Sequence, residues 1–219
     1  EPQSETNWRY ADEANVPRIC FINKMDRTGA SFERSYESIL GRLSKKGVRI
    51  QLPIGEEDRF EGVIDLLKMK AYRFEGEMGI TVVESDIPEE LKGEAQTARG
   101  ELIEKVVEHD DELMSAYLDG KEPLLPDLKK TLRKAVIANA LFPVMTGSAL
   151  KNKGVQLVLD AVVDYLPSPV DLPPVKGADP KTGEVIERRP SDDEPFCALA
   201  FKLQSDPFVG QLTFFRVYS

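Results

Sequence analysis

Residues 19–26 read Ile-Cys-Phe-Ile-Asn-Lys-Met-Asp, a short apolar run followed directly by a polar tetrapeptide of the form N-K-x-D. The apolar run predicts a buried strand. Open α/β sheets bind their ligands at the carboxyl ends of such strands. We therefore expect an α/β fold in which Asn23, Lys24 and Asp26 lie at a ligand-binding edge of the sheet.

The chemistry of this tetrapeptide fits one nucleobase. The carboxylate of Asp26 offers two acceptor oxygens, and guanine presents two adjacent donors, its N1–H and its exocyclic amino group. Adenine lacks this pair and would leave the carboxylate desolvated and unpaired, a mismatch that polar sites reject by roughly 10⁴-fold or more. Asn23 is expected to brace the loop and reach the base edge, and the aliphatic stem of Lys24 to lie across the ring.

A second apolar run ends in small residues between positions 143 and 150, which read Pro-Val-Met-Thr-Gly-Ser-Ala-Leu. Because Ser148 and Ala149 are small, a strand that ends at Ser148, Ala149 and Leu150 can turn a backbone N–H toward a base carbonyl. The next segment has helical periodicity, with Asp160 and Asp164 predicted on the face opposite the apolar one. The expected apolar face consists of Val155, Val158, Leu159, Val162 and Leu166.

These two motifs resemble the base-reading motifs of translational GTPases, and the surrounding sequence is similar to bacterial-type elongation factor G. The resemblance runs along nearly the whole chain, through residues 1–6, 21–27, 61–66, 72–76, 147–156, 165–169 and 206–212. It implies a cytoplasmic, GTP-hydrolysing factor that promotes ribosomal translocation. It also implies that Asn23, Lys24, Asp26, Ser148, Ala149 and Leu150 bind the guanine end of GTP or GDP.

A phosphate-binding loop is missing from this sequence. Such a loop needs the pattern G-x-x-x-x-G-K-[ST], whose backbone N–H groups cradle the phosphates and whose hydroxyl binds Mg²⁺. The pattern occurs nowhere in the 219 residues. We therefore expect an internal fragment that is inactive alone, with the catalytic residues and the Mg²⁺ ligands of the full-length GTPase outside this chain, so no catalytic or metal-binding residue is named.

The resemblance implies an α/β fold that comprises the C-terminal half of a P-loop GTPase domain with an inserted α+β subdomain, followed by the first strands of a β-barrel domain. The expected boundaries are 1–48 and 141–168 for the GTPase domain, 49–140 for the acidic insert, 169–194 for a linker, and 195–219 for the start of the barrel.

Charge is concentrated in the expected insert. Residues 56–122 contain 20 acidic and 8 basic side chains, a net charge of −12, whereas the whole chain carries −9. Binding to polyanions relies on Lys and Arg, so this block is expected to face solvent or a protein partner rather than phosphates. The resemblance implies contact with the stalk proteins of the large ribosomal subunit, without sequence-specific nucleic-acid contacts.

Local patterns predict the remaining elements. Helices are expected near 5–14, 32–43, 89–106, 113–118 and 128–139, and strands at 49–54, 60–66, 69–74, 196–203 and 211–218. Two of these helices have a predicted apolar stripe, which consists of Phe32, Tyr36, Ile39, Leu40 and Leu43 in the helix at 32–43 and of Leu91, Ala95, Ala98, Leu102 and Val106 in the helix at 89–106. Trp8 is expected to be a packing residue. The Pro-rich stretch 167–195 favours an extended connector. Residues 212–218 are expected to form an apolar edge strand that is prone to aggregation without further partners.

Cys20 and Cys197 are expected to be core thiols in a reducing compartment. No apolar run approaches the roughly 18 residues of a membrane span.

The sequence leaves several alternative functions open. Instead of the translocase, the chain could belong to a paralogous translational GTPase, either a ribosome-recycling or an organellar form. It could also be a non-catalytic stalk-binding module, or a stable scaffold without a ligand.

Overall fold

The computed structural model describes residues 2–219, so Glu1, at the start of the first matching stretch, lies outside the described part. Backbone contacts divide the chain after Leu166 into two units, residues 1–166 and 167–219. Each unit is described by itself.

Three parallel strands form the centre of the first unit. They are β1 (Cys20–Ile22), β2 (Gly47–Arg49) and β7 (Phe142–Thr146), in the order β1-β7-β2. All five residues of β7 are buried, as a central strand requires. In the register of the pair, Ile22 lies opposite Thr146, so β1 and β7 end at the same edge of the sheet. The predicted α/β class is confirmed, and both motifs follow strands.

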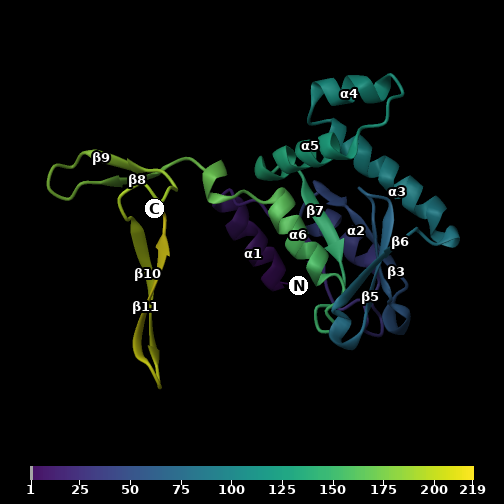
Figure 1. Cartoon of the computed structure of the whole chain (residues 1–219), viewed down its shortest axis with the longest axis horizontal. Coiled ribbons are helices and arrows are strands. Elements are labelled where there is room, and N and C mark those ends of the chain that lie inside the picture. The colour runs from purple at the N-terminus through teal and green to yellow at the C-terminus, as the bar shows by residue number, and fades with distance from the viewer. Residues whose placement is uncertain (1) are drawn as a thin grey trace. The chain divides into compact units, whose positions relative to one another are not determined.

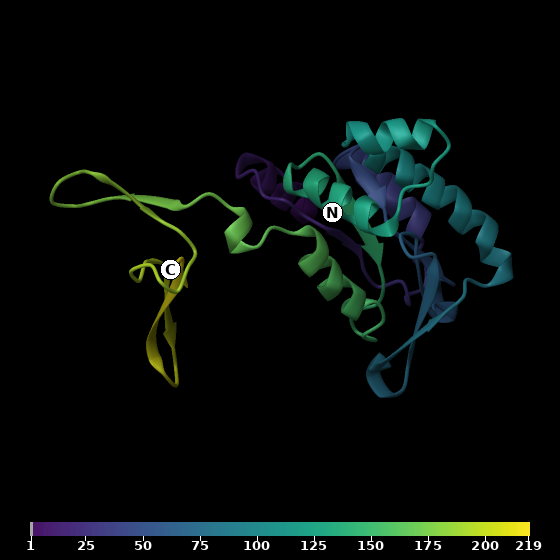
Figure 2. The ribbon, with the colours of Figure 1, turned by 45° about the horizontal axis from the view of Figure 1, so that its top comes forward.

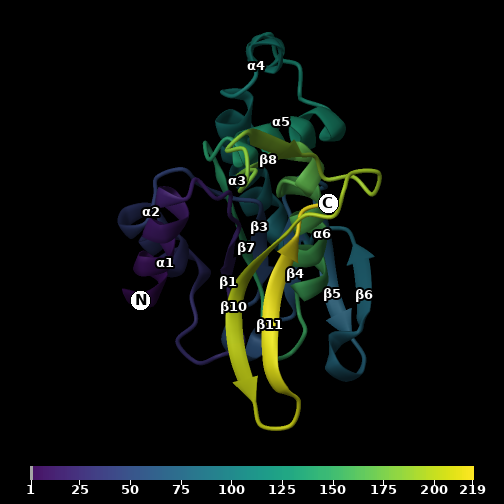
Figure 3. The same ribbon diagram turned by 90° about the vertical axis from the view of Figure 1, so that its left-hand side faces the viewer.

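Helices cover both faces of this sheet. Figure 3 shows α1 (Pro2–Glu13) and α2 (Phe32–Arg42) on one side of β1 and β7, and α6 (Val155–Tyr165) on the other. Helix α2 buries Phe32 and Tyr36, two residues of the predicted apolar stripe. Trp8 of α1 packs edge-on against Phe142 with ring centroids 4.9 Å apart, which confirms its packing role.

The face that α6 turns to the core differs from the prediction. Leu157, Ala161 and Tyr165 are buried. Leu159 and Val162, predicted to be core residues, are 63% and 42% exposed. The helix has apolar residues on more than one side, so periodicity alone does not select a face. Lys129 of α5 (Leu125–Ile137) pairs with Asp164 at 2.5 Å, so the side of α6 that carries Asp164 faces α5.

A four-stranded antiparallel sheet extends the parallel one. It consists of β3 (Gln51–Ile54), β4 (Gly62–Asp65), β5 (Lys70–Glu75) and β6 (Thr81–Ser85), in chain order (Figure 1). The Ile50 N–H, between β2 and β3, donates to the Val144 carbonyl at 3.1 Å and joins the two sheets. Two short 3₁₀ turns, η1 (Glu57–Arg59) and η2 (Glu77–Gly79), connect β3 to β4 and β5 to β6.

Three helices follow the antiparallel sheet. They are α3 (Glu89–Val107), α4 (Asp111–Leu118) and α5 (Leu125–Ile137). In Figure 2 these teal helices lie together at the top of the first unit, and the blue β5–β6 turn lies at its bottom. The predicted apolar positions Ala95, Ala98, Leu102 and Val106 are buried on α3. The short helix predicted at 113–118 is present as α4, and Leu118 at its end is 73% exposed.

The second unit consists of two antiparallel hairpins. Helical turn η3 (Pro169–Asp171) precedes the hairpin of β8 (Val175–Ala178) and β9 (Val185–Arg188). The stretch for which composition favours an extended connector therefore contains a hairpin. Its turn is stabilised by the Asp179 carboxylate, which accepts the N–H groups of Lys181 and Thr182 at 2.7 and 3.2 Å.

The other hairpin pairs β10 (Ala198–Asp206) with β11 (Gly210–Val217), at the two positions where strands were predicted. Asp206 shapes its turn in the same way as Asp179, by accepting the N–H groups of Phe208 and Val209. Within residues 2–219, no helix combines the length and the apolar character needed to cross a membrane.

Candidate functional site

The two sequence motifs meet at the carboxyl edge of the β1–β7 pair. The Met25 N–H donates to the Gly147 carbonyl at 3.1 Å, and the Gly147 N–H donates to the Ile22 carbonyl at 3.0 Å. These bonds continue the parallel pairing beyond the strands. Residues 23–26 and 147–150 therefore form two adjacent loops, although they are more than 120 positions apart in the sequence.

Side chains link the two loops. Ser148 Oγ donates to Asp26 Oδ1 at 2.7 Å. Asn23 Oδ1 accepts the Ala149 N–H at 2.9 Å and the Lys24 N–H at 2.7 Å. The Asn23 amide oxygen therefore bridges the two loops, and the Ala149 N–H donates to this oxygen.

The ionisation state of Asp26 follows from these contacts. The hydrogen bond from Ser148 holds the pKa of the Asp26 carboxyl below its usual value, with smaller contributions from its own backbone N–H and from Arg27 and Lys151. A charged acceptor gains more from a hydrogen bond than a neutral one does, so the bond favours the carboxylate. Asp26 is half-buried and ionised at neutral pH, and Ser148 engages only one of its two oxygens.

The remaining predicted residues frame this carboxylate. Lys24 and Leu150 are both exposed, and Leu150 is 65% accessible. Lys24 has a φ of +65°, a left-handed conformation that is uncommon for a residue with a side chain. All six predicted residues therefore lie in the two neighbouring loops, around the only carboxylate that either loop carries.

In the second loop, the backbone at Gly147 lies close to the Lys153 carbonyl and to the Phe21 ring. A Cβ at Gly147 would lie 2.4 Å from the Lys153 carbonyl oxygen and 2.8 Å from Phe21 Cζ. The backbone of Lys153 in turn pairs with that of Ser148, with N–H···O distances of 3.0 and 2.9 Å. Only glycine fits at position 147, and the closed loop 148–153 places the buried Ser148 hydroxyl against Asp26.

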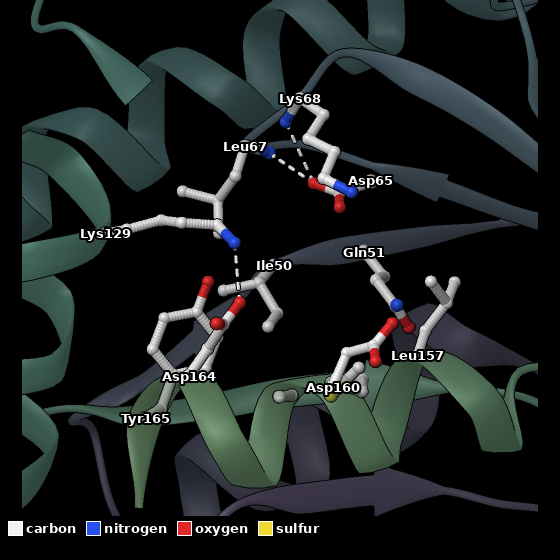
Figure 4. Close-up of a pocket in the computed structure, with 12 residues that line it drawn as sticks. Ile50, Gln51, Asp65, Leu67, Lys68, Lys129, Leu157, Asp160, Asp164 and Tyr165 are labelled. Atoms are coloured by element: carbon white, nitrogen blue, oxygen red, sulfur yellow. Dashed lines mark hydrogen bonds and ion pairs between the residues drawn. The ribbon is translucent and has the colours of Figure 1, made fainter. Parts of the chain in front are cut away.

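A second polar cluster lies between the antiparallel sheet, α5 and α6 (Figure 4). It surrounds a cavity of about 40 Å³, enough for a water molecule. Lys129 pairs with Asp164 at 2.5 Å. Asp65 accepts the N–H groups of Leu67 and Lys68 at 2.8 and 2.9 Å, and burial raises the pKa of its carboxyl. Because Asp65, Lys129 and Asp164 have partners inside the chain, we interpret this cluster as a packing feature, which the sequence analysis did not identify.

No metal site accompanies either cluster in the part of the chain that the structure covers. Across residues 2–219, no group of three or more His, Cys, Asp or Glu side chains is placed to hold an ion.

The sequence of this chain is similar to those of known proteins. The family model for the elongation factor Tu GTP binding domain matches residues 1–168. Elongation factor G from Aquifex pyrophilus is 56% identical over 220 residues, and that from Thermotoga maritima is 53% identical over 219. Both alignments cover 100% of this chain and 32% of the relative, so the chain spans about a third of their length.

One solved structure extends the comparison to the fold. A crystal structure of a protein from Thermus thermophilus aligns with a TM-score of 0.78 at 31% sequence identity. The alignment covers 98% of this chain and 29% of that one.

Proposed function

Because the chain belongs to the elongation factor G family and matches the elongation factor Tu GTP binding domain, we propose that it is the guanine-reading part of a translational GTPase. In this proposal the loops 23–26 and 148–150 bind the base. The observation that carries it is the Ser148 Oγ–Asp26 Oδ1 bond of 2.7 Å, which joins the two loops and orients the carboxylate.

Recognition would depend on Asp26. The bond from Ser148 engages Oδ1 from one side, and Oδ2 stays available as an acceptor. A bound guanine donates its N1–H and its amino group to this ionised carboxylate, and two such bonds to one charged group discriminate strongly. Asn23 keeps the loops at a fixed spacing, and the Lys24 stem and the Leu150 side chain flank the ring.

The phosphates and Mg²⁺ would be held elsewhere in the full-length protein. These 219 residues contain no G-x-x-x-x-G-K-[ST] pattern, which supplies the phosphate cradle and a Mg²⁺ ligand in P-loop proteins. We therefore assign only the guanine end of GTP or GDP to this chain. Hydrolysis, translocation on the ribosome and a cytoplasmic location are properties proposed for the full-length factor.

The test is a change of base preference. In the full-length protein, Asp26→Asn replaces an acceptor by a donor, and xanthine presents a carbonyl where guanine presents its amino group. We expect the variant to lose most of its affinity for GDP and to gain affinity for xanthosine diphosphate. Asp58→Asn, at an exposed carboxylate with no bonding partner within residues 2–219, is the matched control. Unchanged preference for guanine in Asp26→Asn would show that Asp26 does not read the base.

A protein partner for the acidic block is a second proposal. Glu94 of α3 and Glu108, directly after its end, are exposed, whereas Glu101 of the same helix pairs with Arg49 at 2.7 Å. We propose that the free carboxylates of α3 meet basic side chains of a ribosomal stalk protein, since complementary charges guide such encounters. The favourable observation is the net charge of −12 over residues 56–122.

This docking is tested by charge reversal at Glu94 and Glu108, which leaves the Arg49–Glu101 pair intact. We expect ribosome-stimulated GTP turnover to fall and nucleotide affinity to stay constant. If turnover on ribosomes is unaffected, this face of α3 does not dock a ribosomal protein. The same outcome would also argue against the reading of the chain as a stalk-binding module without catalysis.

A further inference from the structure

The η1 turn and its neighbours, residues 55–60, contact the loop that carries Asp26. The Glu57 N–H donates to the Met25 carbonyl at 2.8 Å, and Glu57 Oε1 accepts the Gly29 N–H at 2.7 Å. Met25 directly precedes Asp26, and Gly29 lies three positions after it. Glu57 therefore holds the backbone on both sides of the base-reading carboxylate.

The neighbouring Glu56 fixes the far end of the same loop. Its Oε1 accepts the Phe32 N–H, the first of α2, at 2.7 Å. A carboxylate at a helix N-terminus is stabilised by the helix dipole as well as by the bond itself. Glu56 and Glu57 thus attach the connection between Asp26 and α2 at two points.

The same turn reaches the second loop. Lys153 Nζ donates to the Phe60 carbonyl at 2.8 Å and lies 5.9 Å from the centroid of the Phe60 ring. The backbone of Lys153 is paired with that of Ser148, whose hydroxyl binds Asp26. One short turn is therefore bonded to both loops that surround the carboxylate.

The turn adopts an uncommon backbone conformation to make these contacts. Glu57 has a φ of +57°, which a residue with a Cβ rarely adopts. Gly55 has a φ of +74°, and a Cβ there would lie 2.0 Å from the Arg59 carbonyl oxygen. Such conformations persist where surrounding contacts determine them, and they occur preferentially at functional sites.

We propose that Glu56, Glu57 and Phe60 of this turn position the two guanine-reading loops, and that Glu57 is the positioning residue that sets the place of Asp26. This inference rests on the proposed function. Without the Glu57 carboxylate, the Gly29 N–H loses its acceptor and the backbone after Asp26 is free to move. Two-point recognition of guanine is more sensitive to such movement than a single contact is, because both donors must meet the same carboxylate.

The test compares two nucleotides in the full-length protein. Inosine diphosphate lacks the 2-amino group of GDP, so the ratio of the two dissociation constants reports the geometry of Asp26. We expect Glu57→Ala to weaken GDP binding by about tenfold, as for a lost hydrogen bond to a charged group. The ratio of the dissociation constants of inosine diphosphate and GDP should then move closer to one. Glu57→Gln keeps an acceptor oxygen and should restore most of the ratio, and Asp58→Ala, next to it and exposed, should leave it unchanged.

Thermal unfolding of each variant separates positioning from stability. A loss of stability alone lowers the midpoint without changing the ratio of the two dissociation constants. An unchanged ratio in Glu57→Ala would overturn the inference. Should that variant fail to fold, Glu57→Asp replaces it, because its carboxylate is shorter by one methylene. An unchanged ratio of the two dissociation constants in Glu57→Asp would likewise overturn the inference.

Failure of the proposed function has a different signature. If Asp26→Asn changes base preference and the Glu57 variants do not change the ratio, guanine reading stands and the positioning role is wrong. If Asp26→Asn leaves the preference for guanine intact, the site assignment itself is wrong.

Discussion

Removal of the Ser148 hydroxyl tests the link between the two loops directly in this chain. Ser148 has no solvent exposure, and its Oγ donates to Asp26 Oδ1 at 2.7 Å. Ser148→Ala removes one atom, leaves the backbone pairing with Lys153 in place and abolishes the hydrogen bond. The change therefore isolates one interaction at the centre of the site.

The expected cost follows from the environment of the acceptor. A hydrogen bond to a charged group contributes about 1.5–3 kcal/mol when both partners are buried. Asp26 is only half-buried, and water can replace the lost donor, so solvent screening reduces this value. We expect Ser148→Ala to lower the free energy of unfolding by about 1 kcal/mol at pH 7.

The pH dependence of this stability difference tests the Ser148–Asp26 bond more specifically than its value at pH 7 does. The bond lowers the pKa of Asp26 in the folded state, so its contribution is fully present above the unfolded pKa of about 3.9. It is lost as pH falls through the lower, folded pKa. The stability difference between the wild-type protein and Ser148→Ala should therefore be constant from pH 7 to about 5 and shrink toward the acid range.

The assay is urea unfolding followed by the fluorescence of Trp8, the only tryptophan, which packs on Phe142 in the first unit. Asp26→Ala and the double variant complete a cycle that isolates the coupling energy between the two side chains. A coupling energy of zero at pH 7, or one that does not decrease with acid, would refute the reasoning.

Two further predictions concern the same strands. Gly147→Ala should destabilise the first unit by about 2 kcal/mol in the same urea assay, since its Cβ would lie 2.4 Å from the Lys153 carbonyl oxygen; a variant as stable as the wild type would show that the loop relaxes freely. Burial raises the pKa of the Cys20 thiol to about 11. In a Cys197→Ser background, alkylation of Cys20 at pH 8 should therefore be slow in the folded protein and fast in urea, and equal rates would contradict the burial of this strand.

The parts of the fold that the sequence predicted are those governed by local pattern. An apolar run that ends in a polar tetrapeptide is sufficient to predict β1 and the loop after it. The apolar stripe of α2 appears in the structure as buried Phe32 and Tyr36. Both patterns are contained within about a dozen residues, so no knowledge of distant partners is needed.

The orientation of α6 could not be obtained in this way. Leu157, Ala161 and Tyr165 form one apolar line along the helix, and Leu159, Val162 and Val163 extend apolar character to other sides. The choice between them depends on α5, where Lys129 pairs with Asp164 at 2.5 Å. A contact across 35 positions leaves no periodic signal in either helix.

The contribution of Glu57 to the site was missed for a related reason. Residues 55–60 read Gly-Glu-Glu-Asp-Arg-Phe, and such a charged turn is usually a solvated one. Two of its three carboxylates nevertheless accept backbone N–H groups, from Gly29 in the loop that follows Asp26 and from Phe32 at the start of α2. The third, on Asp58, faces solvent. Composition does not distinguish these carboxylates, because the difference arises only when β3 and β4 place the turn beside the parallel sheet.

The residues that separate the two reading motifs in the sequence are thus the ones that connect them in space. The β3–β4 turn binds both loops through Glu57 and Phe60, and the β5–β6 turn adds a bond from Gln156 Nε2 to the Gly79 carbonyl at 3.2 Å. Both turns belong to the antiparallel sheet that precedes the acidic helix α3. Glu57 is hydrogen-bonded directly to Met25 and Gly29, so we expect a displacement of the β3–β4 turn to move the backbone on either side of Asp26. If the proposals for guanine reading and for docking on α3 both hold, base affinity and partner contact are expected to influence each other through this sheet.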